Sequence, residues 1–156
     1  MSARTVSDLV MHSPRLIEVT DTVEGAVRKV LDSEIAALPV VDEQQRYRGI
    51  FGEREFMSAL FPGYLDQLQG AAFLSRSIEH ALKKRQGCSR EPVERYINTE
   101  HVEVETDHSD TQLAEIFLHH RVLIIPVLDE GRVEGVVTRR DFFRALAEHF
   151  LDSSHE

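Results

Sequence analysis

Two stretches of the chain repeat one another, and this repetition constrains the fold more than any other feature. Residues 49–60 read GIFGEREFMSAL, and residues 135–146 read GVVTRRDFFRAL. An apolar run that contains a proline precedes each stretch, ALPVV at 37–41 and LIIPVL at 123–128. Self-similarity in register over several segments indicates a duplicated structural unit, here two copies of roughly sixty residues each.

The pattern of apolar residues predicts the element order β-α-β-β-α within each copy. Helices are predicted where apolar residues recur every three or four positions, over 22–33 with Thr22 as N-cap and over 110–120 with Asp110 as N-cap. Strands are predicted at the β-rich and apolar runs, namely 16–19, 37–41 and 47–51 in the first copy and 101–104, 123–128 and 133–137 in the second. A last helix is predicted to begin near Glu53 and near Arg139.

The size of the unit explains why it occurs twice. One copy alone would bury too little apolar surface, whereas two copies packed sheet against sheet share one interior. The predicted fold is therefore α/β, with two tandem motifs related by a pseudo-twofold axis and two equivalent clefts. The predicted boundaries are 1–62 for the first motif, 63–90 for a connector and 91–152 for the second motif. Apolar spacing in the connector predicts two short amphipathic helices, which we expect to pack against the module's own flank rather than to dock a partner.

The composition narrows the classes of partner. The chain has 27 acidic and 18 basic residues and a net charge of −9, so its surface repels phosphate backbones and nucleic acid is not an expected partner. The single cysteine, Cys88, excludes an intramolecular disulfide, and the histidines lack the spacing of metal ligands, so no metal site is expected. No uncharged apolar run approaches about 18 residues and no signal peptide is recognisable. We therefore expect a cytoplasmic protein without a membrane contact.

Catalytic chemistry is not expected either. The sequence shows no nucleophile with an adjacent base, no phosphate-binding P-loop and no pair of carboxylates at helical spacing. No catalytic residue is therefore assigned, and the chain is not predicted to be an enzyme.

The turn from strand to helix in the second copy carries the clearest binding chemistry. Thr138 presents a hydroxyl just before the helix, and Asp141 follows in the first turn on the same side. An ionised carboxylate accepts two hydrogen bonds, which suits the vicinal hydroxyls of a ribose, and a helix N-terminus favours phosphate. Arg139 and Arg140 add fixed positive charge. A simpler interpretation stays open, in which Thr138 caps the helix and Asp141 complements its dipole.

The two copies resemble CBS motifs, named after cystathionine β-synthase, and the pair resembles a Bateman module. The resemblance rests on the predicted strands PVVD and PVLD and on the signature GVVTRRD, which follows in the second copy. The resemblance implies a regulatory module that binds an adenosine derivative (AMP, ADP, ATP or S-adenosylmethionine) and changes its own arrangement or that of a regulated protein partner. It also implies a flat homodimer formed through the motif helices. Phe56, Phe142 and Phe143 fit that use, and core burial would explain them equally well.

The same resemblance assigns roles to residues of the second copy. Thr138 and Asp141 are expected to hold the ribose. The adenine is expected between the first strand and the apolar strand of this copy, partly against backbone groups, at Val102, Ile124 and Ile125. The phosphate is expected at the arginines near the helix, with Arg140 as the leading candidate and Arg139 and Arg121 behind it.

The first copy departs from the signature at both ribose positions. It has Gly52 in place of the hydroxyl and Glu55 in place of the aspartate. Each hydrogen bond to a charged group that is lost costs about 1.5–3 kcal/mol, so we predict one competent cleft, in the second motif, and a weakened or empty one in the first. The alternative, from a different functional class, is a structural dimerisation module whose clefts bind no ligand.

Overall fold

The computed structural model describes residues 11–61, 78–80, 82–83 and 85–154 and has two three-stranded sheets. The first sheet contains β1 (Ile17–Glu18), β2 (Ala37–Val41) and β3 (Tyr47–Gly52). The second contains β4 (Val104–Glu105), β5 (Ile124–Asp129) and β6 (Arg132–Thr138). In each sheet the first pair of strands is parallel and the second pair antiparallel. The helices are α2 (Val23–Ser33), α3 (Glu53–Leu60), α6 (Asp110–His119) and α7 (Arg139–Ser153). The α/β class and the twofold β-α-β-β-α order are therefore confirmed.

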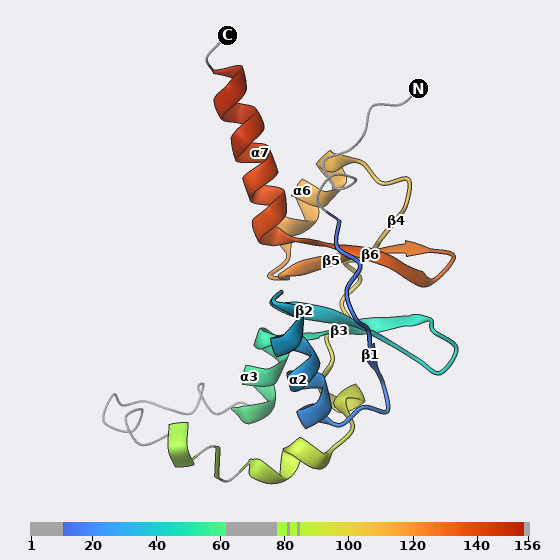
Figure 1. The fold of residues 1–156 in the computed structure, drawn as a ribbon, viewed down its shortest axis with the longest axis vertical. Coiled ribbons are helices and arrows are strands. Elements are labelled where there is room, and N and C mark those ends of the chain that lie inside the picture. The colour runs from blue at the N-terminus through green and yellow to red at the C-terminus, as the bar shows by residue number, and fades with distance from the viewer. Residues whose placement is uncertain (1–10, 62–77, 81, 84, 155–156) are drawn as a thin grey trace.

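The two sheets face one another across a shared interior, and the helices lie on the outer sides (Figure 1). One core cluster joins Ala37 and Ile50 of the first motif to residues of all three strands of the second, such as Val104 and Ile125. The strand β2 is buried along its whole length, as its unbroken apolar run predicts. Each motif thus completes the apolar interior of the other, which explains why the unit is duplicated.

The helix starts agree with the predicted capping chemistry at one position and differ at another. Thr22 caps α2, and its hydroxyl oxygen accepts a hydrogen bond of 3.0 Å from the amide of Gly25. For α6 the predicted cap Asp110 is wrong. Ser109 is the N-cap and accepts a bond of 3.1 Å from the amide of Gln112, while Asp110 is the first helical residue. A carboxylate in the first turn complements the helix dipole, so Asp110 is favourable there without being the cap.

The segment before the first strand of each motif crosses to the sheet of the other motif. His12 pairs with Val136 on β6, and both backbone amides donate bonds of 2.8 Å. By the same pseudo-symmetry, Asn98 pairs with Ile50 on β3, with bonds of 2.8 and 2.9 Å. The free edge of each last strand is therefore covered by chain that belongs to the other half.

These crossings explain the glycines that open the repeated stretches. A Cβ atom on Gly135 would lie 2.7 Å from the carbonyl oxygen of His12, and one on Gly49 would lie 2.6 Å from that of Asn98. Both distances are shorter than any real contact, so a side chain at either position would push the crossing segment away. Gly135 therefore allows close backbone packing, and the N-terminal segment is its packing partner.

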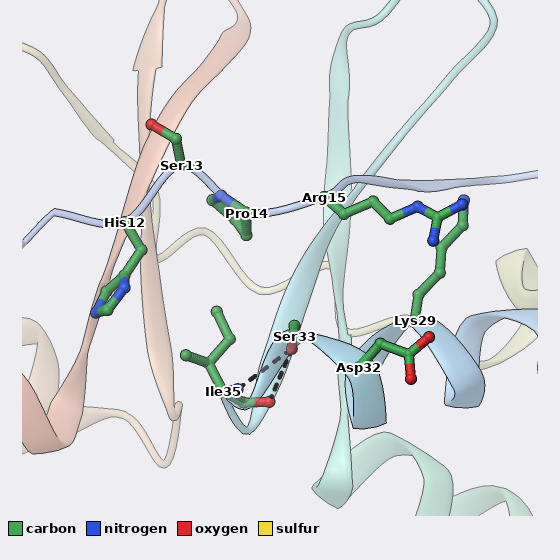
Figure 2. A pocket seen from close by; sticks show the side chains of 8 residues that line it. All are labelled: His12, Ser13, Pro14, Arg15, Lys29, Asp32, Ser33 and Ile35. Carbon is green, nitrogen blue, oxygen red and sulfur yellow. Dashed lines mark hydrogen bonds between the residues drawn. The ribbon is translucent and has the colours of Figure 1, made fainter.

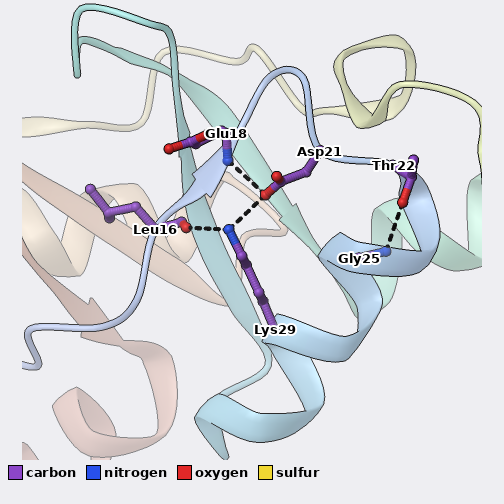
Figure 3. A network of polar contacts seen from close by, with 6 residues as sticks. All are labelled: Leu16, Glu18, Asp21, Thr22, Gly25 and Lys29. Carbon is purple, nitrogen blue, oxygen red and sulfur yellow. Dashed lines mark hydrogen bonds and ion pairs between the residues drawn. The ribbon is translucent and has the colours of Figure 1, made fainter.

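A polar network fixes the first strand of motif 1 against α2 (Figure 3). One carboxylate oxygen of Asp21 accepts bonds from the amide of Glu18 at 3.0 Å and from the ammonium of Lys29 at 2.7 Å. Lys29 also donates to the carbonyl of Leu16 at 3.1 Å. Because Lys29 and Asp21 are both mostly buried, their charges are paired inside the fold rather than in solvent.

The connector is described in part. The first predicted amphipathic helix, with Leu65, Leu68 and Ala72, lies outside the described residues. Residues 78–80 and 82–83 are helical, and Ile78 and Leu82 are 62% and 45% exposed, so the packing of this helix against the module's flank stays a prediction. The connector is anchored further on, where η1 (Gln86–Arg90) packs on α2 and buries Cys88.

Candidate functional site

A pocket of about 270 Å³ opens between the N-terminal segment and the end of α2. Its lining residues are His12, Ser13, Pro14, Arg15, Lys29, Asp32, Ser33 and Ile35. Figure 2 shows His12 at one end, the charged side chains of Arg15, Lys29 and Asp32 at the other, and Ile35 between them. All of these residues come from motif 1. The binding residues predicted from the sequence all lie in motif 2, so none of the lining residues was predicted.

The pocket meets motif 2 through His12. The Nε2 atom of His12 lies 2.5 Å from the Oδ2 atom of Asp141, in the first turn of α7. This hydrogen bond is the main cause that holds the pKa of Asp141 below its ordinary value, and Thr138 and the charge of Arg144 lower that pKa further. Asp141 is therefore an ionised carboxylate with its side chain 30% exposed, and it contacts the pocket-lining residue His12 without lining the pocket itself.

Thr138 performs the capping role that the sequence analysis kept open. Its hydroxyl oxygen accepts a bond of 3.1 Å from the amide of Asp141, and the residue is 8% exposed. Since a hydroxyl that accepts one bond can still donate another, the capping geometry leaves the ribose contact of Thr138 as a prediction.

The three predicted phosphate residues, Arg121, Arg139 and Arg140, are all exposed, and none lines the pocket. Arg139 and Arg140 occupy the first two positions of α7, one and two residues before Asp141 in the chain. The pocket supplies two other cations, Arg15 and Lys29. Nothing in their local sequence marks them as site residues, and Lys29 is paired with Asp21 within motif 1.

The predicted adenine residues have a different place in the fold. Val102, Ile124 and Ile125 are 0% exposed and belong to the shared core. A ligand cannot touch a residue without exposed surface unless the sheets separate. The structure thus brings Thr138 and Asp141 together, whereas the three predicted adenine residues are buried in the shared core.

The corresponding region of the first motif has different chemistry. Burial raises the pKa of Glu55, the counterpart of Asp141. Burial also raises the pKa of Tyr47, and the negative charges of Glu103 and Glu55 raise it further. Among the described residues, the Tyr47 hydroxyl and the Oε2 atom of Glu103 are buried without a hydrogen-bond partner. The carboxyl groups of Glu55 and Glu103 both act on Tyr47, and negative charge gathered in this way disfavours a phosphate.

The family model for the CBS domain matches the chain twice, at residues 6–62 and 93–148. These two matches cover well over half of the sequence, and the chain belongs to the CBS domain family. The pair of motifs, each with its three-stranded sheet, is the arrangement that the duplicated sequence predicts.

Relatives with known names are distant. The chain is 22% identical over 148 residues to hypoxic response protein 1 of Mycobacterium tuberculosis, with 94% of this chain and 88% of that protein covered. It is 24% identical over 143 residues to an A-adding tRNA nucleotidyltransferase of Aquifex aeolicus, with 92% of this chain covered. That match spans 14% of the enzyme's length, so the enzyme's activity is not transferred to this chain.

Solved structures share the fold. A CBS domain of a membrane protein from Sphaerobacter thermophilus superposes with a TM-score of 0.67 at 20% identity, over 90% of this chain and 86% of that one. The structure of CBSX2 in complex with AMP superposes with a TM-score of 0.66 at 17% identity, over 94% and 98% of the two chains.

Two further features concern the described residues alone. No helix there has the length and apolar character that crossing a membrane requires. Within the same residues, no three His, Cys, Asp or Glu side chains gather closely enough to hold a metal ion.

Proposed function

We propose that this CBS pair is a regulatory, non-catalytic module that binds one adenosine nucleotide per chain, in the pocket beside Asp141. The observation that carries the proposal is an ionised carboxylate at a helix N-terminus, in direct contact with His12, which lines a pocket of about 270 Å³. A carboxylate in this setting accepts hydrogen bonds from both hydroxyls of a ribose. The AMP complex of CBSX2, which has the same fold, supports a nucleotide as the ligand class.

The lining suggests how the ligand is oriented. With the ribose at Asp141, the base extends into the pocket, where Pro14 and Ile35 provide apolar surface. The phosphate then lies toward the N-terminus of α7, where the helix dipole favours an anion and Arg139 and Arg140 are exposed. This arrangement uses both motifs, so a bound nucleotide would tie the N-terminal segment to α7 and favour one arrangement of the module.

The first motif is expected to leave its equivalent site unoccupied. Glu55 of this motif and Glu103 of the second motif both lie near Tyr47 and disfavour a phosphate, and Gly52 supplies no hydroxyl. One nucleotide per chain follows from this difference.

Equilibrium titration with AMP, ADP, ATP and S-adenosylmethionine tests the proposal. We expect at least one of these ligands to bind with one site per chain and, at a concentration of 100 times its Kd, to stabilise the fold by about 2.7 kcal/mol. Two sites of equal affinity per chain would contradict the predicted asymmetry. No stabilisation by any of the four at millimolar concentration would instead favour the second candidate function, a structural module without a ligand.

We also propose that α7 mediates pairing with a second copy of the chain. Phe143, Leu146 and Phe150 lie on one face of α7 and are 68%, 42% and 70% exposed, while Phe142 on another face is buried and contacts Phe117 with ring centroids 5.5 Å apart. Figure 1 shows the C-terminal part of α7 extending beyond its own motif. An apolar stripe on a projecting helix is suited to a matching stripe on an identical helix.

Sedimentation velocity checks this pairing. The wild type is expected to sediment as a dimer, and Phe150→Asp as a monomer, because a charge in a dimer core is strongly unfavourable. Leu118→Asp is the matched control, since Leu118 is 80% exposed on α6, and it should leave the dimer intact. A monomeric wild type, or equal loss in both variants, would exclude the α7 stripe as the interface.

A further inference from the structure

The carboxylate proposed to hold the ribose already has a partner within the chain. The imidazole of His12 lies 2.5 Å from Asp141, and the two side chains are 41% and 30% exposed. His12 also lines the pocket. A nucleotide that places its ribose on Asp141 must therefore displace this imidazole or share the carboxylate with it.

The backbone of His12 is held independently of its side chain. Its amide and carbonyl both pair with Val136 on β6 at 2.8 Å, and Gly135 allows this close approach. The imidazole can consequently leave Asp141 by a side-chain rotation while the crossing segment stays on the sheet. The His12 side chain can then adopt two states, one in contact with Asp141 and one released from it.

Charged groups surround the pair on several elements. From α7, Arg144 faces Asp141 and helps to lower its pKa, as does His12 itself. From the pocket side the charged groups are Arg15 on the N-terminal segment and Lys29 and Asp32 on α2. β6 meets His12 with the backbone of Val136. The carboxylate of Asp141 thus stays ionised between pH 5 and 8, the range in which a histidine side chain can in general take up a proton.

We propose that His12 and Asp141 form a proton-dependent latch on the nucleotide site, so that ligand affinity falls as the pH falls. The latch rests on the proposed function, because it regulates the same site. A protonated imidazole forms a charge-assisted bond with the carboxylate, and the ribose hydroxyls must break that bond to bind. At higher pH the imidazole is neutral, its bond to Asp141 is weaker, and the carboxylate becomes available.

Adenosine is the probe that separates the latch from other titrations, because it has no phosphate group that changes charge in this range. We expect wild-type affinity for adenosine to fall about ten-fold between pH 8 and pH 5.5, the size of one charge-assisted hydrogen bond at its lower limit. His12→Gln keeps a polar side chain of similar size but cannot take up a proton, and its affinity should not depend on pH. His120→Gln removes the histidine of a similar pair, 3.1 Å from Glu100, and should behave as wild type.

A second measurement needs no ligand. Carboxyl titration of Asp141 by NMR should show that its pKa rises toward the ordinary value in His12→Gln and does not move in His120→Gln. If the pKa of Asp141 is the same in His12→Gln as in the wild type, the latch is overturned, whatever the measured nucleotide affinities are. A changed titration with equal pH dependence of adenosine affinity in wild type and His12→Gln would leave a structural pair and overturn the gating.

The two proposals fail in distinguishable ways. If the carboxyl titration responds to His12→Gln but neither protein binds adenosine or AMP at any pH, the nucleotide site is wrong and the latch regulates nothing. If His12→Gln binds adenosine at pH 5.5 and wild type does not, both the site and its latch are supported.

Discussion

Replacement of Asp141 by alanine is expected to lower the affinity for AMP by about ten- to a hundred-fold. The variant removes the carboxylate that would accept the ribose hydroxyls, and each hydrogen bond to a charged group is worth about 1.5–3 kcal/mol, or one to two decades of affinity. The fold should survive, because Thr138 still caps α7 through the backbone amide of residue 141. Calorimetric titration at pH 8, where the latch is open, measures the loss, and thermal unfolding confirms that the variant is folded.

The matched control is Glu55→Ala at the same position of the first motif. Glu55 lies in the first turn of α3 as Asp141 lies in that of α7, so both variants remove a negative charge from a helix N-terminus. We expect Glu55→Ala to bind AMP with wild-type affinity. Full affinity in Asp141→Ala, or an equal loss in the two variants, would refute the assignment of the site to the second motif.

Replacement of Gly52 by alanine is expected to destabilise the protein by about 3 kcal/mol, at the upper end of the usual cost of overpacking. A Cβ atom at this position would lie 2.4 Å from both the carbonyl oxygen of Ala36 and the Cβ atom of Ala37, and 2.5 Å from the Cα atom of Ala37. Two of these atoms, the carbonyl oxygen of Ala36 and the Cα atom of Ala37, belong to the backbone at the start of β2, so the strain cannot be relieved by moving a flexible side chain. Urea unfolding measures the difference in the free energy of unfolding.

Gly87 provides the comparison for Gly52→Ala. A Cβ atom there meets nothing within 4 Å, so Gly87→Ala should change the free energy of unfolding by less than about 0.5 kcal/mol. A change of that small size in Gly52→Ala would show that the strand can move aside at little cost and would contradict the expectation.

Gly52 also changes the explanation of the asymmetry between the motifs. The sequence comparison attributes the weaker first cleft to a missing hydroxyl and a longer acidic side chain. In the structure, Thr138 has a backbone ψ of 148°, whereas Gly52 has a ψ of −152° and lies close against Ala36 and Ala37. Gly52→Thr is therefore not expected to restore the binding signature in the first motif, because Ala36 and Ala37 leave no space for the threonine side chain.

Local patterns were enough to predict most of the fold. Helix periodicity predicted α2 and its cap Thr22, and the unbroken apolar run of residues 37–41 predicted β2 at its observed bounds. The assignment of Asp110 as a cap failed because the adjacent Ser109 is an equally good capping residue, and the choice between them depends on where the helix begins. Such one-residue differences are decided by packing rather than by the pattern.

Only the motif 2 part of the candidate site could be predicted from the sequence. Asp141 could be identified because its chemistry depends on a helix start a few residues away. His12 and the pocket behind it could not, since their contact with motif 2 depends on a chain crossing that no local pattern marks. Ile124 and Ile125 were assigned to the adenine as apolar strand residues, but the same apolar character places them in the core.

The crossing segments make the two halves inseparable. Motif 1 would lose Asn98, the partner of Ile50 on the outer edge of β3, if the chain were divided at the connector, and motif 2 would lose His12 from β6. Each isolated half would then present an unpaired strand edge, a known route to aggregation. The two halves therefore exchange edge segments. A force applied to the N-terminal segment of motif 1 would act directly on β6, the last strand of motif 2.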